Sequence, residues 1–185
     1  GEKNIMKIEK TKIDGLYIIE FDIFRDNRGE LIKPYTFKEY KEYPINLDFK
    51  ETWFTKSNKD VIRAMHLQIG EEACEKLVSV INGSVIDVIL DTRKDSKTFG
   101  EWVEIKLDAK EKGKALYIPI GCAHGYKVLE DNTITLYMAT EVHSPKNDTG
   151  LRYNSFGYDW KIEKPIISKK DEELLTFEEF VKIRG

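Results

Sequence analysis

One histidine and two cations form the most suggestive group of reactive side chains in this sequence. Arg63 precedes His66 by three residues, and Lys76 follows it by ten. The chain holds only 3 histidines, so a proton-transfer site that works near neutral pH has few candidates for its base. An Arg-x-x-His unit with a downstream lysine can hold an anionic ligand beside such a base.

Each of these residues also has an ordinary structural explanation. His66 and His124 could be hydrogen-bonded interior histidines, and Tyr137 could be a core residue of a predicted strand. The cations favour a chemical role for His66, because burying Arg63 and Lys76 in sheet segments is costly without an anionic partner. An arginine suits a phosphate, and a lysine suits a developing oxyanion. A phenol inside a barrel can deliver a proton from the face opposite a base.

Composition and charge indicate a soluble globular protein. We expect one domain over residues 1–185. The net charge of -3 and the pI near 5.8 argue against binding of nucleic acid or of an anionic membrane. No apolar run approaches the roughly 18–20 residues that span a bilayer. The charged N-terminal segment has no signal-peptide core, so we expect a cytoplasmic location with Cys74 and Cys122 as reduced, packed thiols.

The predicted elements are typical of an all-β sandwich or barrel with short flanking helices. Asn82-Gly83 is a strong hairpin signal between two apolar runs, and residues 25–29 indicate a turn. Helices are predicted over residues 37–43 and 169–183, with Ser168 as a possible cap of the second. The predicted strands cover residues 16–21, 77–81, 84–90, 102–107, 114–118, 125–129 and 133–140.

Residues 113–124 follow the second signature of the cupin jelly roll. Gly113, Pro119, Gly121 and His124 occupy its characteristic positions. Pro119 and Gly121 then form a tight turn, after which His124 points into the barrel. The sequence therefore predicts a cupin-type double-stranded β-helix.

The matching first signature lacks one histidine of the His-x-His pair that metal-binding cupins usually carry, because the segment ends in His66-Leu-Gln68. An amide is a poor metal ligand, and three strong donors are the usual minimum at a catalytic metal site. We therefore expect no metal and no other cofactor. A metal-dependent cupin isomerase or oxygenase that uses His66, His124 and Glu71 or Glu72 is the alternative hypothesis.

Ordered motifs run from about residue 16 to residue 174. They are Phe24-Arg-Asp-Asn-Arg-Gly29, Ile62-Arg-Ala-Met-His66, Lys76-Leu-Val, Gly83-x-Val-x-Asp-Val-x-Leu-Asp-x-Arg93, Ser96-Lys-Thr-Phe-Gly100, Ile118-Pro-x-Gly-x-Ala-His-Gly125, Tyr137 and Ile167-Ser-Lys-Lys-Asp171. This series resembles the dTDP-4-dehydrorhamnose 3,5-epimerase family, cupin-fold enzymes of nucleotide-sugar biosynthesis. The resemblance implies an enzyme without metal or organic cofactor, acting as a homodimer in which a neighbour's residues help to line the site.

The resemblance also implies residue roles. His66 is the general base, Asp171 orients it, Tyr137 is the proton donor on the opposite face of the sugar, and Lys76 stabilises the enolate. The ligand-binding positions are Arg28 and Arg63 for the diphosphate and nucleotide, His124 and Lys170 near the sugar and diphosphate, and Asp148 as an acidic ligand contact.

Several positions depart from the family pattern. His143 replaces a tyrosine that stacks on the nucleotide base, and Lys33 replaces an acidic residue. A Gln-Asp-Asn stretch reads Glu51-Thr-Trp53, and Ala64 replaces a glycine. We count Lys33, Glu51, Trp53 and His143 as substrate-binding positions and interpret them as a change of specificity. A GDP-, CDP- or UDP-linked 4-keto sugar, either a deoxyhexose or a heptose for a surface polysaccharide, is the predicted ligand.

The leading hypothesis is therefore an epimerase that inverts C3, C5 or both in a nucleoside-diphosphate 4-keto sugar. A second alternative is a sugar-nucleotide binding module that has lost catalysis. Retention of His66, Asp171 and Tyr137 together argues against that alternative.

Overall fold

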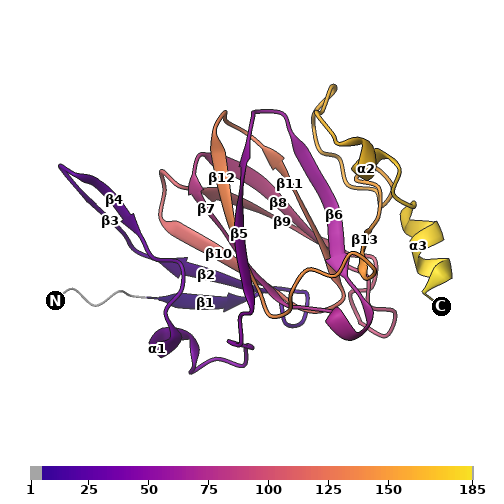
Figure 1. The fold of residues 1–185 in the computed structure, drawn as a ribbon, viewed down its shortest axis with the longest axis horizontal. Helices are drawn as coiled ribbons and strands as arrows, with labels where there is room; N and C mark the ends of the chain where they lie inside the picture. Colours follow the sequence, from indigo (N-terminus) through magenta and orange to yellow (C-terminus); the bar gives the residue numbers. More distant parts are fainter. Residues whose placement is uncertain (1–5, 185) are drawn as a thin grey trace.

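Two β-sheets face each other in the computed structural model, which describes residues 6–184 (Figure 1). The larger sheet has the strand order β1-β2-β10-β7-β12-β5, and the smaller has the order β13-β6-β11-β8-β9. The larger sheet consists of β1 (Lys7–Lys10), β2 (Tyr17–Phe21), β5 (Glu51–Ser57), β7 (Lys76–Asn82), β10 (Gly113–Ile118) and β12 (Thr133–Ala139). The smaller consists of β6 (Ile62–Gln68), β8 (Ser84–Asp91), β9 (Trp102–Asp108), β11 (Cys122–Val128) and β13 (Asp148–Gly150).

The period-two alternation of side chains along the strands builds the core between the sheets. In β12, the buried Thr133, Thr135 and Tyr137 alternate with more exposed residues. Inward-facing aliphatic side chains, among them Val78 and Ile89, form the cluster between the sheets. Polar side chains on the same inward faces form the site described below.

Short helices and loops cover the outer faces of both sheets. The helix α1 (Phe37–Tyr40) places the fully buried Tyr40 against the larger sheet. On the other side, α2 (Lys169–Glu172) and α3 (Phe177–Ile183) lie outside the smaller sheet (Figure 1). Phe180 of α3 packs in one cluster with Val88 and Leu90 of β8. The strand β8 is therefore buried on both faces.

A two-stranded hairpin projects away from the rest of the molecule (Figure 1). It consists of β3 (Ile23–Asp26) and β4 (Gly29–Ile32). At its base, the Arg25 guanidinium donates to the Ala109 carbonyl over 2.8 Å. Its tip carries Arg28, whose side chain is 86% exposed. The tip of the hairpin therefore carries an exposed ion pair between Arg28 and Asp26.

Most of the predicted elements are confirmed. The all-β class, each predicted strand and the hairpin turn at Asn82-Gly83 are present, where Gly83 has a φ of 76°. The prediction of one helix over residues 169–183 is wrong, because Thr176 begins a second helix with a capping box closed by Glu179. The predicted helix over residues 37–43 ends at Tyr40. Residues 1–5 and 185 of the predicted domain lie outside the described part of the chain.

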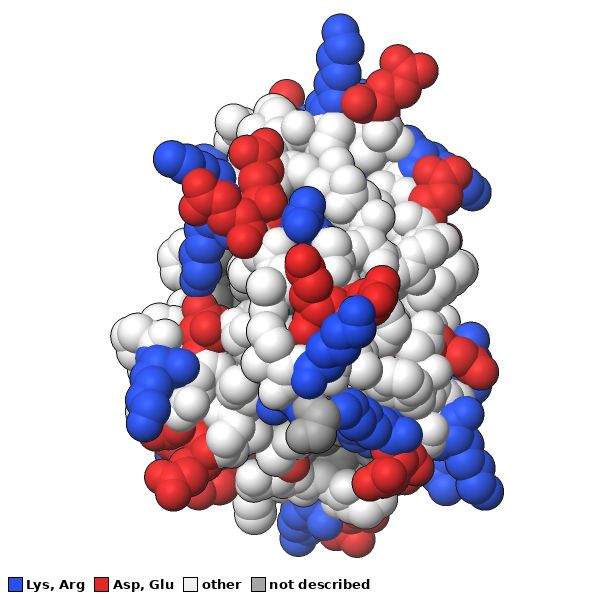
Figure 2. All heavy atoms as spheres, turned by 90° about the vertical axis from the view of Figure 1, so that its right-hand side faces the viewer, with Lys and Arg blue, Asp and Glu red and all other residues white. Residues whose placement is uncertain are grey.

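The surface carries charges of both signs. On the face that includes the C-terminal helices, lysines and arginines are interspersed with acidic residues (Figure 2). Within residues 6–184, no helix is long and apolar enough to cross a membrane. Cys74 and Cys122 are buried free thiols, as expected.

Candidate active site

A cavity of about 580 Å³ opens between the two sheets. The larger sheet lines it from β5, β7 and β12, the smaller sheet from β6, β11 and β13, and the C-terminal segment adds Ser168, Lys170 and Asp171. Every predicted site residue except Arg28 and Lys33 lines this cavity. The fold therefore brings together residues that are distant in the sequence.

His66 and Asp171 form a pair at the wall of the cavity. His66 Nε2 lies 3.0 Å from Asp171 Oδ1. Burial alone would raise the pKa of Asp171, but the hydrogen bond and charge of His66, with smaller contributions from Ala64 and Ser168, hold that pKa below its usual range. The carboxylate therefore stays ionised and orients the imidazole, whose Nδ1 is left to accept a proton.

Tyr137 projects into the cavity from β12, in the sheet opposite His66. Its ring stacks on Trp53 of the neighbouring strand β5, with a centroid distance of 4.9 Å and an interplanar angle of 6°. The side chain is only 7% exposed, and burial raises its pKa well above the usual value. A neutral phenol on the wall opposite a base is placed to act as a proton donor.

Lys76 enters the same cavity from β7. Burial lowers the pKa of its ammonium group, and the nearby Cys74 and Asp148 oppose that change only in part. Within residues 6–184, its side chain forms no hydrogen bond and no ion pair. Such an ammonium group is available to stabilise an anion that forms in the cavity.

His124 is the cross-strand neighbour of His66 in the smaller sheet. Its Nε2 lies 2.5 Å from Oδ1 of Asp87, and both side chains are almost completely buried. Burial raises the pKa of Asp87, and the charge of His124 opposes that change. The pair therefore fixes the orientation of His124 at the floor of the cavity.

Four polar residues meet at the mouth of the cavity. Asp148 Oδ2 accepts a hydrogen bond from Lys170 Nζ over 2.7 Å and lies 3.5 Å from His143 Nε2. Burial would raise the pKa of Asp148, but the hydrogen bond and charge of Lys170, the charge of His66 and the His143 hydrogen bond together lower it below the usual value. The backbone N–H of His143 donates to Glu51 Oε2 over 2.8 Å. The mouth can thus offer both charged and aromatic contacts to a ligand.

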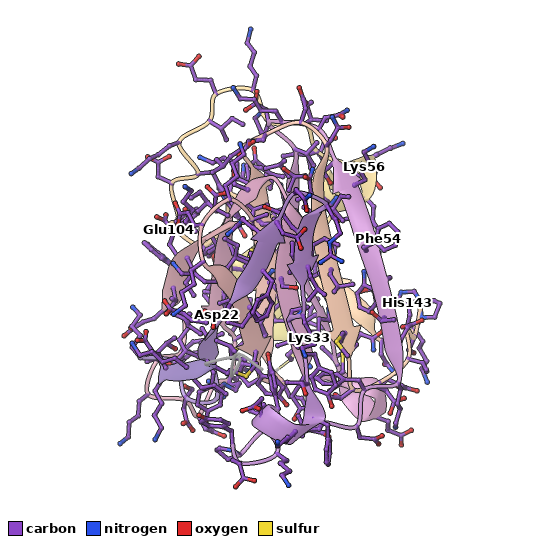
Figure 3. All side chains as sticks on the ribbon, turned by 90° about the vertical axis from the view of Figure 1, so that its left-hand side faces the viewer. Asp22, Lys33, Phe54, Lys56, Glu104 and His143 are labelled. Carbon is purple, nitrogen blue, oxygen red and sulfur yellow. The ribbon has the colours of Figure 1, made fainter. Side chains whose placement is uncertain are left out.

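Three cations that were predicted to bind the ligand are not buried in the cavity as expected. Arg63 lines the cavity, but its side chain is exposed at the open side, where Nε donates to Ser57 Oγ over 3.0 Å. The expectation that Arg63 is buried is therefore wrong, and its burial cost gives no support for a chemical role of His66. Arg28 lies on the projecting hairpin, Lys33 follows β4, and His143 lies beside Glu51 at the start of β5 (Figure 3). Neither Arg28 nor Lys33 lines the cavity of its own chain.

The alternative metal site lacks its donors in this arrangement. His66 and His124 are adjacent, but Glu71 and Glu72 lie in a short 3-10 helix (Gly70–Glu72) and do not line the cavity. Among the described residues, no group of three or more histidine, cysteine, aspartate or glutamate side chains is arranged to hold a metal ion.

Several cavity residues were missed in the sequence. They are Gln68, Cys74, Tyr126, Ala139, Glu141 and Ser168. All but Ser168 lie two or four positions from a predicted site residue on the same stretch of chain. The alternation of side chains in strands could have identified them. Ser168 was considered only as a helix cap, and it does accept the N–H of Asp171.

The fold is a β-barrel, and its cavity holds an imidazole–carboxylate pair, a buried phenol and an ammonium group. A sequence profile described as dTDP-4-dehydrorhamnose 3,5-epimerase matches residues 10–179. The dTDP-4-dehydrorhamnose 3,5-epimerase of Escherichia coli K12 is 36% identical, covering 97% of this chain and 98% of the relative. Its counterpart in Methanothermobacter thermautotrophicus is also 36% identical, covering 88% and 89%.

A solved structure of a sugar-nucleotide epimerase is also similar to this chain. The dTDP-6-deoxy-D-glucose-3,5-epimerase of Legionella pneumophila Philadelphia 1, in complex with dTDP-4-keto-L-rhamnose, superposes with a TM-score of 0.86 and 34% identity over 94% of each chain. The chain belongs to the dTDP-4-dehydrorhamnose 3,5-epimerase family. The predicted family and the cupin-type fold are thereby confirmed.

The Lys76 ammonium group should oppose folding. The pKa of Lys76 is lower in the folded than in the unfolded protein, so the free-energy cost of burying its charge is complete below the folded-state pKa. This cost disappears as the pH rises through the unfolded-state pKa of about 10.4. We expect Lys76→Met to raise the Tm at pH 7 by about 2–4 °C relative to the wild type. This difference between the two Tm values should become smaller as the pH approaches 10. Thermal unfolding against the exposed control Lys97→Met measures both effects. A Tm below that of the wild type would contradict this explanation.

Proposed function

We propose that this protein epimerises a nucleoside-diphosphate 4-keto sugar by proton transfer between His66 and Tyr137. The observation that carries the proposal is the placement of a carboxylate-bound imidazole and a buried phenol on opposite sheets of one cavity. The relatives named above are epimerases of dTDP-linked deoxy sugars. The same cavity offers cationic and aromatic contacts for a nucleotide diphosphate.

The chemistry follows from the acidity of carbons next to a ketone. A proton on C3 or C5 of a 4-keto sugar is acidified, because the carbanion delocalises onto the C4 oxygen. His66 removes that proton from one face of the ring, and Tyr137 donates a proton to the opposite face, which inverts the centre. Lys76 stabilises the enolate oxygen, a role for which one well-placed donor is worth roughly 3–4 kcal/mol. The reaction inverts C3, C5 or both.

The remaining cavity residues bind the substrate. Arg63, His124 and Lys170 contact the diphosphate and the sugar, since cationic and hydrogen-bonding groups suit those oxygens. At the mouth, Glu51, Trp53, His143 and Asp148 contact the sugar and the nucleotide.

Proton exchange tests the reaction. In deuterium oxide, the wild type should place deuterium on C3, C5 or both of dTDP-4-keto-L-rhamnose or of a GDP-, UDP- or CDP-linked 4-keto sugar, as counted by NMR. His66→Asn should lower the exchange rate by about 10²–10⁴-fold, because an amide cannot act as the base. Circular dichroism confirms that the variant is folded. The absence of exchange by the wild type with every candidate would refute the proposed function.

The active unit is a homodimer in which the β3–β4 hairpin of one subunit reaches the cavity of the other. Arg28 and the 57% exposed Leu31 lie on a hairpin that projects away from its own cavity. The outer side of β5 exposes Phe54 at 66%, beside Lys56 (Figure 3). Exposed apolar side chains of this size favour association. In the dimer, Arg28 and Lys33 bind the diphosphate and nucleotide held by the partner.

Subunit mixing tests this shared site. Arg28→Ala and His66→Asn should each be poorly active alone, and exchange of subunits between them should restore activity, because one cavity of each mixed dimer has both residues intact. Re-annealing of each single variant with itself is the control. If mixed dimers form by native mass spectrometry but activity stays low, Arg28 does not act in the partner's cavity.

The nucleotide is predicted from the residues that depart from the family pattern. His143 is half-exposed at the mouth and replaces a base-stacking tyrosine, so we expect GDP, UDP or CDP to be bound more tightly than dTDP. Each nucleotide raises the Tm in proportion to the logarithm of its concentration over its dissociation constant. A thermal-shift series with the four nucleotides therefore ranks them directly. A clear preference for dTDP would contradict this prediction.

A cytoplasmic location fits the proposed substrate. Nucleotide sugars are intracellular metabolites, and the free thiols of Cys74 and Cys122 suit a reducing compartment. Fractionation of cells that express the untagged chain tests this location.

A further inference from the structure

One buried amide in the cavity wall has no part in the reaction described above. Gln68 lies on β6, two residues after His66, and is 6% exposed. It stands where the first cupin signature usually carries its second histidine. A primary amide offers two N–H donors and an acceptor oxygen, whereas a neutral imidazole offers one donor and one acceptor. Because a buried amide is expected to be hydrogen-bonded, the partners of Gln68 indicate what it does.

The partners of Gln68 are backbone groups of two loops. Its Nε2 donates to the Glu72 carbonyl over 2.8 Å and to the Val142 carbonyl over 3.1 Å. Its Oε1 accepts the backbone N–H of Ser144 over 2.7 Å. These bonds occupy both N–H groups of the amide and its oxygen. Gln68 therefore serves the loops rather than a ligand, although it lines the cavity.

The backbone that Gln68 holds carries His143. Val142 and Ser144 are the direct neighbours of His143, and the N–H of His143 itself donates to Glu51 Oε2 over 2.8 Å. This segment lies between β12 and β13 and forms neither helix nor strand. Ordering such a segment when a ligand binds would weaken binding. Two side chains of the barrel instead fix three consecutive backbone groups at the mouth before a ligand arrives.

The strand pairing of Gln68 also places the partner of the His143 ring. Asp148 on β13 is the cross-strand neighbour of Gln68 on β6. Asp148 Oδ2 lies 3.5 Å from His143 Nε2. The backbone of His143 and the carboxylate beside its ring are therefore both located from one position of β6. That position fixes an imidazole whose side chain is 56% exposed.

Resting on the nucleotide binding proposed above, we propose that Gln68 is a positioning residue that holds the His143 imidazole in place to stack on the base of the nucleotide. An aromatic ring held in this way stacks on a base without first being ordered. Among the described residues, Gln68 forms no hydrogen bond with His66, Tyr137 or Lys76. Gln68 therefore acts on the affinity for the nucleotide and not on the rate of proton transfer.

A double-mutant cycle tests whether Gln68 acts through His143. Calorimetry measures the Kd of the nucleotide that binds the wild type most tightly among GDP, UDP, CDP and dTDP. His143→Ala should raise this Kd on the order of tenfold, the effect of losing one base–aromatic stack, and Gln68→Met should raise it by a similar factor. In the double variant, Gln68→Met should add less than about twofold, because residues that act through one contact are not additive.

The rate of deuterium exchange separates positioning of the nucleotide contact from damage to the proton-transfer groups. At saturating 4-keto sugar, Gln68→Met should exchange at the wild-type rate, because its own bonds do not reach those groups. Thr92→Val is the matched control. Thr92 is a buried side chain that donates to the Gly121 carbonyl over 2.7 Å outside the main cavity. Its loss should change neither the Kd nor the exchange rate, and the Tm of each variant reports the general loss of stability.

The outcomes separate this proposal from the proposed function. An unchanged Kd in Gln68→Met, or an equal rise in the presence and absence of the His143 ring, would overturn the role of Gln68. A slower exchange at saturation with an unchanged Kd would overturn it as well. If Gln68→Met does not fold, the cycle is run with Gln68→Glu, which keeps the acceptor for Ser144 and loses both donors, and the same results overturn the proposal.

The wild type itself distinguishes the two failures. Nucleotide binding without exchange of any candidate sugar would refute the proposed reaction alone, because the cycle depends only on nucleotide affinity. If none of the four nucleotides binds the wild type, the proposed function is refuted, and the role of Gln68 with it.

Discussion

The contact between His66 and Asp171 links the proposed base to a segment near the end of the described chain. The smaller sheet positions His66 through its pairing with β11 and β13, but nothing in that sheet supplies its carboxylate. Asp171 reaches it because Ser168 caps α2 and the 3.0 Å contact orients both side chains. The C-terminal segment is therefore part of the site as well as a cover for the smaller sheet. Local melting of α2 would remove the partner of the base while leaving the barrel intact.

The cavity holds charges that an apolar core would not contain. Burial is the largest influence on the pKa values of Lys76, Asp87 and Asp171, and it shifts the pKa of Lys76 down and that of Asp87 up. For Asp171, the hydrogen bond and charge of His66, with Ala64 and Ser168, more than offset burial, whereas Lys76 has no ion-pair partner among the described residues. The Lys76 cation lines the cavity that the proposed substrate would occupy. Sites that depart from ordinary core packing in this way are the ones where function is expected.

The strands could be predicted because they depend on local signals, whereas most of the cavity residues were predicted from the resemblance to the epimerase family. Asn82-Gly83 selects a hairpin through its backbone preferences, and the strands alternate as expected. The break at Thr176 was missed, since the apolar pattern of residues 169–183 continues across it and only the capping box divides the helices. The place of Tyr126 in the cavity follows from the alternation of β11, but its hydrogen bond with Thr55 does not. That bond joins two sheets, and no spacing along the chain reveals it. The direction of the β3–β4 hairpin, which carries Arg28, likewise has no local signal, and Arg28 does not line the cavity of its own chain.

The edge strand β5 connects three properties that would otherwise be independent. Its inward residues Glu51, Trp53 and Thr55 contact, in order, the backbone of His143 at the mouth, the ring of Tyr137 and the hydroxyl of Tyr126. Its outward residue Phe54 is exposed on the surface that we propose contacts a second subunit. Because a shift of one residue in the pairing of β5 with β12 would exchange these two faces, the register of β5 fixes the contacts inside the cavity and the exposure of Phe54 together. Pairing with β12 along the full length of the strand, from Glu51 to Ser57, holds that register.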